Sequence, residues 1–147
     1  MSEKTSQYQS PVFAVLNDHE FELREPFVFE WLENDDLHQI TIPAGYSFDG
    51  ASVPRICWSL TGLIPTGIHM GASAVHDYCY QRRGLISGNT LKKWDVQMGW
   101  KPEPVKWERS QCDDMFRQIM VAAGETPWKT TVMYWAVRLF GQAAWDR

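Results

Sequence analysis

The feature that most constrains this fold is a change in hydrophobic pattern partway along the chain. Within residues 11–48, short runs of β-branched and aromatic residues or polar–apolar alternation predict three strands, at Val12–Leu16, Pro26–Leu32 and Leu37–Ile42. Asn34–Asp36 supplies a turn before the last of them. From residue 67 onward, apolar residues recur at helical spacing. This order predicts an α+β fold, in which a small N-terminal antiparallel β meander precedes about three helices.

The predicted helices are bounded by capping residues and glycines. They are expected over residues 67–83, 105–123 and 127–141. Gly84 is predicted to end the first helix as its C′ residue. Thr126 and Pro127 are predicted to begin the third as N-cap and N1. Residues Leu85–Pro104 are rich in Gly, Pro and Trp, so we expect a loop there that serves as a lid or a partner surface.

The composition is that of one globular domain. With 147 residues, 44% of them hydrophobic and 22% charged, we expect a flexible N-terminus over residues 1–10 and a single domain over 11–147. The net charge of −4 and the lack of a long basic run argue against a nucleic-acid partner. Three widely spaced cysteines favour reduced, buried thiols. No signal-peptide pattern or membrane-spanning run is present, so we expect a cytoplasmic protein.

The first candidate site lies at the junction of the two parts of the chain. Such junctions form clefts in α+β domains, and their loops direct side chains toward ligands. We therefore expect Asp49 as a candidate metal ligand and Ser52 and Arg55 as candidate binding residues. A structural interpretation stays open, because Asp49-Gly50 is a favourable turn pair and Ser52 can cap a helix that begins near Pro54.

The second candidate site centres on His76 and Asp77 in the first predicted helix. Their neighbours are Ala, Val, Cys and Tyr, so both are expected to be buried with polar partners. Tyr80 lies one turn after His76 and shares its face. If the next helix runs antiparallel, an inward-facing Asp113 would reach His76, which is the arrangement for general-base activation of water. The alternative is a polar network that only fixes the packing.

Four segments, taken in order, resemble a family of uncharacterised proteins from tailed phages and prophages. They are DGASVP at 49–54, HDYCY at 76–80, the downstream Asp and Phe of the second predicted helix, and VRLFGQAAW at 137–145. The resemblance extends from Tyr46 to Trp145. It implies a viral or prophage origin, and hence a place in the host cytoplasm or in association with a virion, but it implies no mechanism.

The HDYCY motif is also similar to the H-D-x-x-Y helix of secreted and parvovirus-capsid phospholipases A2. This resemblance implies that His76 is a general base and Asp77 a calcium ligand. It also implies that Asp113 orients the histidine and that Tyr80 supports the network. The chain departs from those enzymes because it has no clear glycine-rich calcium loop before the helix and none of their disulfides. A zinc site that uses His69, His76 and Asp77 is a less favoured alternative, since no histidine follows His76.

Two functions therefore stay open. One is a metal-assisted hydrolase with His76 as its base and a divalent cation such as calcium as its cofactor. The other is a protein that binds a host or virion protein through aromatic anchors. These are Trp94, Trp100 and Trp107 in and beside the expected loop, together with the C-terminal Trp128, Trp135 and Trp145. The sequence slightly favours partner binding as the biological role. It places any active site between Asp49 and the His76 helix.

Overall fold

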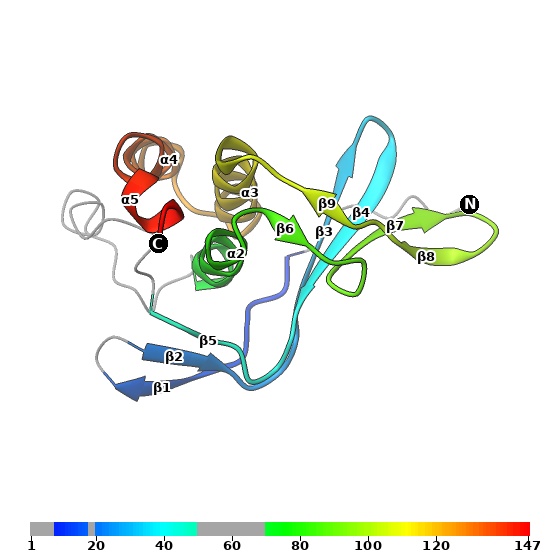
Figure 1. Ribbon diagram of the computed structural model, residues 1–147, viewed down its shortest axis with the longest axis horizontal. Coiled ribbons are helices and arrows are strands. Elements are labelled where there is room, and N and C mark those ends of the chain that lie inside the picture. The colour runs from blue at the N-terminus through cyan, green and yellow to red at the C-terminus, as the bar shows by residue number, and fades with distance from the viewer. Residues whose placement is uncertain (1–7, 18–19, 50–69) are drawn as a thin grey trace.

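The computed structural model describes residues 8–17, 20–49 and 70–147, and it has the predicted α+β fold. Antiparallel strands come first along the chain, and the long helices pack together beside them (Figure 1). The N-terminal strands are β1 (Phe13–Asn17), β2 (Glu20–Leu23), β3 (Phe27–Glu33), β4 (Asp36–Ile42) and β5 (Ser47–Phe48). The labels are those of Figure 1.

The predicted N-terminal meander is divided between two sheets. Among the described residues, β1, β2 and β5 form one antiparallel sheet, and the β3–β4 hairpin begins another. Asn34 and Asp35 form the turn of that hairpin at φ values of 52° and 66°. A tight two-residue hairpin needs the left-handed conformation at both positions, and Asn and Asp tolerate it well. The predicted turn is therefore confirmed.

The predicted loop over Leu85–Pro104 is wrong, because much of it forms strands. They are β6 (Leu85–Ile86), β7 (Leu91–Asp95) and β8 (Gly99–Pro102). Strand β7 pairs with β4, which extends the larger sheet to the order β3-β4-β7-β8. The sequence pattern does not reveal β7, because Lys92 and Lys93 interrupt the polar–apolar alternation that marks a strand.

The turn of the β7–β8 hairpin is closed by a side chain. Asp95 accepts backbone hydrogen bonds from Gln97 at 2.8 Å and from Met98 at 2.9 Å. Gly99 completes the turn at a φ of 76°, a left-handed conformation that favours glycine. The hairpin projects from the end of the sheet, away from the helices (Figure 1).

Helix α2 (Met70–Gln81) is the centre of the fold. All of its residues except Gln81 are buried, and it contacts helix α3 on one side and strands β4 and β5 on another. Its small residues allow close approach, because a Cβ on Gly71 would lie 2.5 Å from the ring of Phe27. Tyr8, which falls in the segment expected to be flexible, packs against the same ring.

The end of α2 differs by one residue from the prediction. Arg83, at a φ of 50°, occupies the left-handed C′ position that was predicted for Gly84. Its backbone N–H bonds to the carbonyl of Tyr80 at 3.0 Å, and that of Gly84 bonds to Cys79 at 2.9 Å. These two bonds are the pair that defines a Schellman motif. Gly84, at a φ of 78°, follows as the next residue of the motif.

Helix α3 (Arg109–Ala122) begins later than predicted. Its expected first residues form strand β9 (Val105–Lys106), which pairs with β6. Glu108 and Gln111 then form a reciprocal capping box at the start of the helix. Gly124, at a φ of 89°, ends the helix as predicted.

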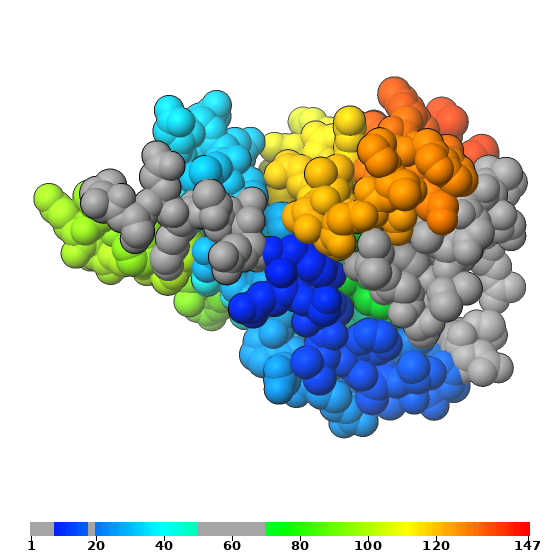
Figure 2. All heavy atoms as spheres, turned by 180° about the vertical axis from the view of Figure 1, so that it is seen from behind, coloured from blue at the N-terminus to red at the C-terminus, as the bar shows by residue number. Residues whose placement is uncertain are grey.

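Helix α4 (Pro127–Phe140) begins as predicted, with Thr126 as N-cap and Pro127 in the first turn. A short helix that the sequence did not indicate, α5 (Gln142–Trp145), follows Gly141. Helix α4 packs on α3 and lies at the molecular surface, where it is orange in Figure 2. Within the described ranges, every helix is too short or too polar to cross a membrane.

Candidate functional site

Helix α2 carries two ionisable residues into the core. His76 has no exposed surface, and Asp77 is 2% exposed. The residues on either side of this pair are buried as well. Burial of such groups is costly without hydrogen-bond partners. The contacts of these two residues therefore define the candidate site.

His76 and Asp113 form a direct hydrogen bond between α2 and α3. The distance from His76 Nε2 to Asp113 Oδ1 is 2.7 Å, and neither side chain has exposed surface. Asp113 lies on the buried face of α3, with Cys112 and Phe116, and the ring of Phe116 lies 4.9 Å from that of His76. The expected contact between the histidine and an inward-facing Asp113 is thus present.

Tyr80 joins the same carboxylate oxygen. Its hydroxyl donates to Asp113 Oδ1 at 2.6 Å, and its ring lies 4.1 Å from that of His76, one helical turn earlier. Burial, reinforced by the hydrogen bond to Asp113, raises the pKa of the Tyr80 phenol well above its ordinary value. The hydroxyl therefore stays protonated and acts as a donor.

Two arginines bind the other oxygen of Asp113, and sequence reasoning missed both. Arg138 of α4 donates to Oδ2 at 2.8 Å, and Arg109 of α3 approaches it at 3.4 Å. Arg109 also donates to the backbone carbonyls of Val137 and Arg138, each at 2.9 Å. One available signal was the i,i+4 spacing of Arg109 and Asp113. The other was a lone arginine in the last turn of the mostly apolar helix α4.

These donors keep Asp113 ionised. Burial acts to raise the pKa of this carboxyl, but hydrogen bonds from His76, Tyr80 and Arg138 outweigh burial and hold the pKa below its ordinary value. A buried carboxylate that is paired and fully hydrogen-bonded is a rigid anchor. The carboxylate of Asp113, on α3, therefore bonds to side chains of α2 and α4 and links the three helices.

Asp77 faces a different neighbour from His76. Its Oδ2 accepts the backbone N–H of Asp49 at 3.3 Å, at the end of strand β5. Adjacent residues on a helix point about 100° apart, so His76 faces α3 while Asp77 faces β5. The two predicted metal ligands thus lie next to each other. The described part of the chain contains no cluster of three or more His, Cys, Asp or Glu that could hold a metal ion.

A shallow pocket lies beside Asp49. It has a volume of about 380 Å³, and its lining includes Asp49 with Phe48 of β5, Glu20 of β2, and Gln81. Gln81 is one helical turn after Asp77 on α2, so the pocket opens on the Asp77 side of the helix. Ser52, Arg55 and His69, the remaining candidates near this junction, lie outside the described residues.

The predicted binding residues Trp94 and Trp100 lie in another part of the molecule. They face each other across the β7–β8 hairpin, with ring centroids 5.3 Å apart at 73°. Such a cross-strand pair stabilises a hairpin. The structure therefore brings His76, Tyr80 and Asp113 together, but it places the two tryptophans on the hairpin that projects from the sheet (Figure 1).

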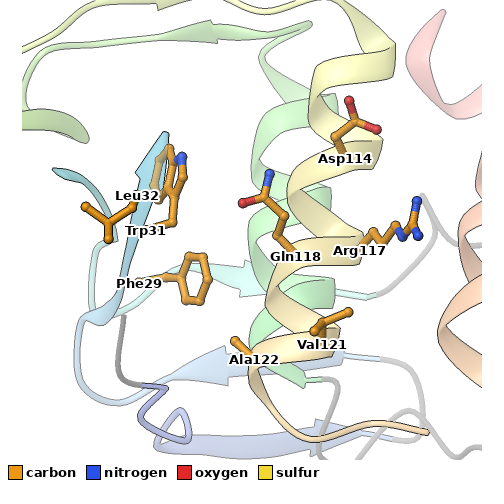
Figure 3. Close-up of a pocket in the computed structure, with 8 residues that line it drawn as sticks. All are labelled: Phe29, Trp31, Leu32, Asp114, Arg117, Gln118, Val121 and Ala122. Carbon is orange, nitrogen blue, oxygen red and sulfur yellow. The ribbon is translucent and has the colours of Figure 1, made fainter. Parts of the chain in front are cut away.

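A second, larger groove is also separate from the histidine. It has a volume of about 520 Å³ and runs between β3 and α3 (Figure 3). Its lining residues are Phe29, Trp31, Leu32, Asp114, Arg117, Gln118, Val121 and Ala122. Asp114 follows Asp113 on α3, so it points to the other side of the helix. The candidate site therefore rests on the buried contacts of His76, and this groove is no part of it.

Comparison with known proteins places the chain in a family. The family described as "Protein of unknown function (DUF1353)" matches residues 21–137, which is most of the chain. The chain belongs to this family. The DUF1353 match includes His76, Asp77, Tyr80 and Asp113, and it ends one residue before Arg138. The resemblance to an uncharacterised family is thus confirmed, whereas this description assigns no phage origin, activity or partner.

A similar sequence occurs in a longer bacterial protein. "Uncharacterized protein y4jT" of Sinorhizobium fredii (strain NBRC 101917 / NGR234) is 27% identical over 131 residues. The alignment covers 89% of this chain and 29% of that protein, so this DUF1353 chain spans less than a third of its relative. No solved structure matches the chain.

Proposed function

We propose that this protein is a hydrolase in which His76 is the general base and Asp113 orients it. The observation that carries the proposal is the 2.7 Å hydrogen bond between His76 Nε2 and Asp113 Oδ1. An ionised Asp113 accepts a hydrogen bond from the N–H group at Nε2, which leaves the lone pair of the ring on Nδ1. In the proposed step, a water admitted beside the ring gives a proton to Nδ1, and its oxygen attacks the substrate. The imidazolium then returns the proton to the leaving group.

The contacts around Asp113 support its role in orienting the histidine. Arg138 and Arg109 both approach Asp113 Oδ2, so two guanidinium groups share the carboxylate charge. Tyr80 holds Oδ1 from a second direction and fixes the orientation of the acceptor. The contacts among His76, Tyr80 and Asp113 also agree with the arrangement that the resemblance to phospholipases A2 implies.

Asp77 is proposed to hold a cation or a polar group of the substrate. Its hydrogen bond to Asp49 places two carboxyl-bearing residues at the junction of α2 and β5, beside the pocket of about 380 Å³. Calcium prefers six to eight oxygen ligands, so two carboxylates would need water, backbone or substrate oxygens to complete its shell. Asp77 and Asp49 would hold the cation, which would supply Lewis-acid polarisation of the substrate, and His76 moves the proton.

The test is a screen for hydrolysis of phospholipid, peptidoglycan and phosphodiester substrates, with and without calcium. Wild type should hydrolyse one of these classes, and His76→Asn should lose about 100-fold or more of that rate, the usual contribution of a general base. Asp114→Asn is the control, because Asp114 follows Asp113 on α3, is exposed and accepts a hydrogen bond from Tyr134. Because burial of His76 also suits a structural role, the folded fraction is measured by circular dichroism. A His76→Asn protein that is folded and as active as wild type contradicts the proposal.

A second candidate function is binding of a host or virion protein through the β7–β8 hairpin. The observation that favours it is the exposure of Trp94, Val96 and Met98 on a hairpin that projects from the sheet (Figure 1). Strand β8 is also the last strand of its sheet, where a partner strand can add. The test compares capture of one defined host or virion protein by wild type and by Val96→Ser with Met98→Ser. Equal capture by both proteins contradicts this role.

A further inference from the structure

Helix α4 exposes large apolar side chains, most of them on one face. Four of them are between 56% and 69% exposed, namely Trp128, Trp135, Leu139 and Phe140. At 100° per residue, the positions 128, 135 and 139 fall in one stripe along the helix. The opposite face is anchored in the core through Met133 and Val137. The helix therefore lies along the surface with a continuous apolar stripe directed outward.

The same segment carries no negative charge. Residues 126–145 contain no Asp or Glu, although the whole chain contains 18 of them. Lys129 lies at one end of the stripe, with its ammonium nitrogen 5.6 Å from the centroid of the Trp128 ring. The stripe thus has a cation at its N-terminal end, and the nearest acidic residues along the chain, Glu125 and Asp146, lie outside it.

We propose that this face of α4 docks the protein on an anionic lipid surface. Tryptophan side chains are favoured at the boundary between lipid headgroups and acyl chains. Leu139 and Phe140 add apolar area at the end of the same helix, and Lys129 supplies a charge that attracts anionic headgroups. No described helix is able to span a bilayer, so the contact is peripheral.

The charges also favour lipid over a second copy of the chain. In a dimer that used α4 on both sides, each copy would present Lys129 and no acidic residue along the stripe, so like charges would face each other. An anionic lipid surface offers the opposite charge together with an apolar layer. The docking role is independent of the hydrolase proposal, because no residue of the stripe contacts His76 or Asp113 through a described hydrogen bond.

The experiment is co-sedimentation with vesicles of equal parts phosphatidylcholine and phosphatidylglycerol, beside vesicles of phosphatidylcholine alone. Wild type should bind the mixed vesicles, and added salt should weaken the binding. Trp135→Ser with Leu139→Ser should raise the lipid concentration for half binding by about tenfold or more, from the lost apolar burial. Lys129→Glu should weaken binding to the mixed vesicles only. Val15→Ser is the matched control, because Val15 is an exposed apolar residue on strand β1.

Three results would overturn the inference. The first is wild-type protein that stays in solution with the mixed vesicles. The second is equal binding to both kinds of vesicle, which removes the role of anionic headgroups. The third is a dimer, seen by light scattering, that Trp135→Ser with Leu139→Ser dissociates while vesicle binding is unchanged. Trp128→Ser provides a second, single change on the same stripe if the double variant is not folded.

Discussion

Arg138 and Asp113 join the end of α4 to the buried face of α3 through a hydrogen bond of 2.8 Å. Asp113 is fully buried, whereas the Arg138 side chain keeps 26% of its surface exposed. The pair therefore brings a charge from the protein surface to the one carboxylate that also binds His76 and Tyr80. The position of α4 and the ionisation of the candidate site depend on the same contact.

Removal of Arg138 should destabilise the fold. Arg138→Met leaves the Oδ2 atom of buried Asp113 with only the longer contact to Arg109, so we expect a loss of about 2 kcal/mol in the free energy of unfolding, discounted for the partial exposure of the arginine. Urea unfolding measures it. Arg117→Met is the control, because Arg117 is exposed and should change the same quantity by less than about 0.5 kcal/mol. Equal losses of unfolding free energy in Arg138→Met and Arg117→Met would show that Arg138 does not stabilise the buried Asp113 carboxylate.

The stability of the protein should fall in acid because of Asp113. Its folded-state pKa is held below the ordinary value, so its contribution to stability is fully present above about pH 4 and is lost as the pH falls through the folded-state pKa. The free energy of unfolding, measured between neutral pH and pH values below the ordinary Asp range, should decline for wild type. Asp113→Asn should be less stable at neutral pH and should show a shallower decline. A parallel decline in both proteins would assign the acid sensitivity to other carboxylates.

The hydroxyl of Tyr80 should stabilise the site. Tyr80→Phe removes a buried donor to an ionised carboxylate, so we expect a loss of about 2 kcal/mol in the free energy of unfolding. Tyr134→Phe is a matched control, because its hydroxyl bonds to the exposed Asp114 and its removal should cost less than about 0.5 kcal/mol. Thermal or urea unfolding of the two variants gives the comparison. An unchanged free energy of unfolding in Tyr80→Phe would mean that the hydrogen bond from His76 alone satisfies Asp113 Oδ1.

Gly84 should tolerate no side chain. It has a φ of 78°, and a Cβ there would lie 1.8 Å from the backbone oxygen of Trp107. We therefore expect Gly84→Ala to lower the free energy of unfolding by about 3 kcal/mol or more. Gly45→Ala isolates the effect of conformation, because Gly45 has a φ of 86° and nothing lies within 4 Å of the added Cβ. We expect about 1 kcal/mol for that control. Similar losses at both positions would argue against close packing at Gly84.

Metal binding tests the proposed role of Asp77. Calorimetric titration with calcium, magnesium and zinc should show that wild type binds calcium and that Asp77→Asn does not. His76, Tyr80 and Asp113 are kept unchanged in this variant. Lys92→Gln is a control for general charge effects, since Lys92 lies on strand β7. If no cation binds wild type, Asp77 would instead hold a polar group of the substrate or of the protein.

Much of the helical half could be predicted from local signals. Thr126-Pro127 marks the start of α4, and Gly124 marks the end of α3. The contact of His76 with Asp113 followed from helical periodicity and from the antiparallel packing expected of neighbouring helices. These features depend on residues that are close in sequence, or on one simple packing rule.

Features that depend on distant contacts could not be predicted in the same way. Strand β7 carries Lys92 and Lys93 because it is only partly buried, so it forms through its pairing with β4 and shows no alternating pattern. Arg138 reaches Asp113 from 25 residues away, across the packing of α4 on α3. Arg83 adopts a left-handed φ of 50° before Gly84, because Gly84 is required where the chain meets Trp107. In each case tertiary contacts decide the local conformation.

The most direct test of the account is the protonation state of His76, measured by nitrogen NMR of the labelled imidazole at neutral pH. A general-base role for His76 requires a neutral ring whose proton is on Nε2 and bonds to Asp113, so that the lone pair on Nδ1 is the base. In Asp113→Asn this preference should weaken, because the amide is a weaker acceptor than the carboxylate. A proton found on Nδ1, or a ring that is positively charged at neutral pH, would contradict the assignment of His76 as the general base.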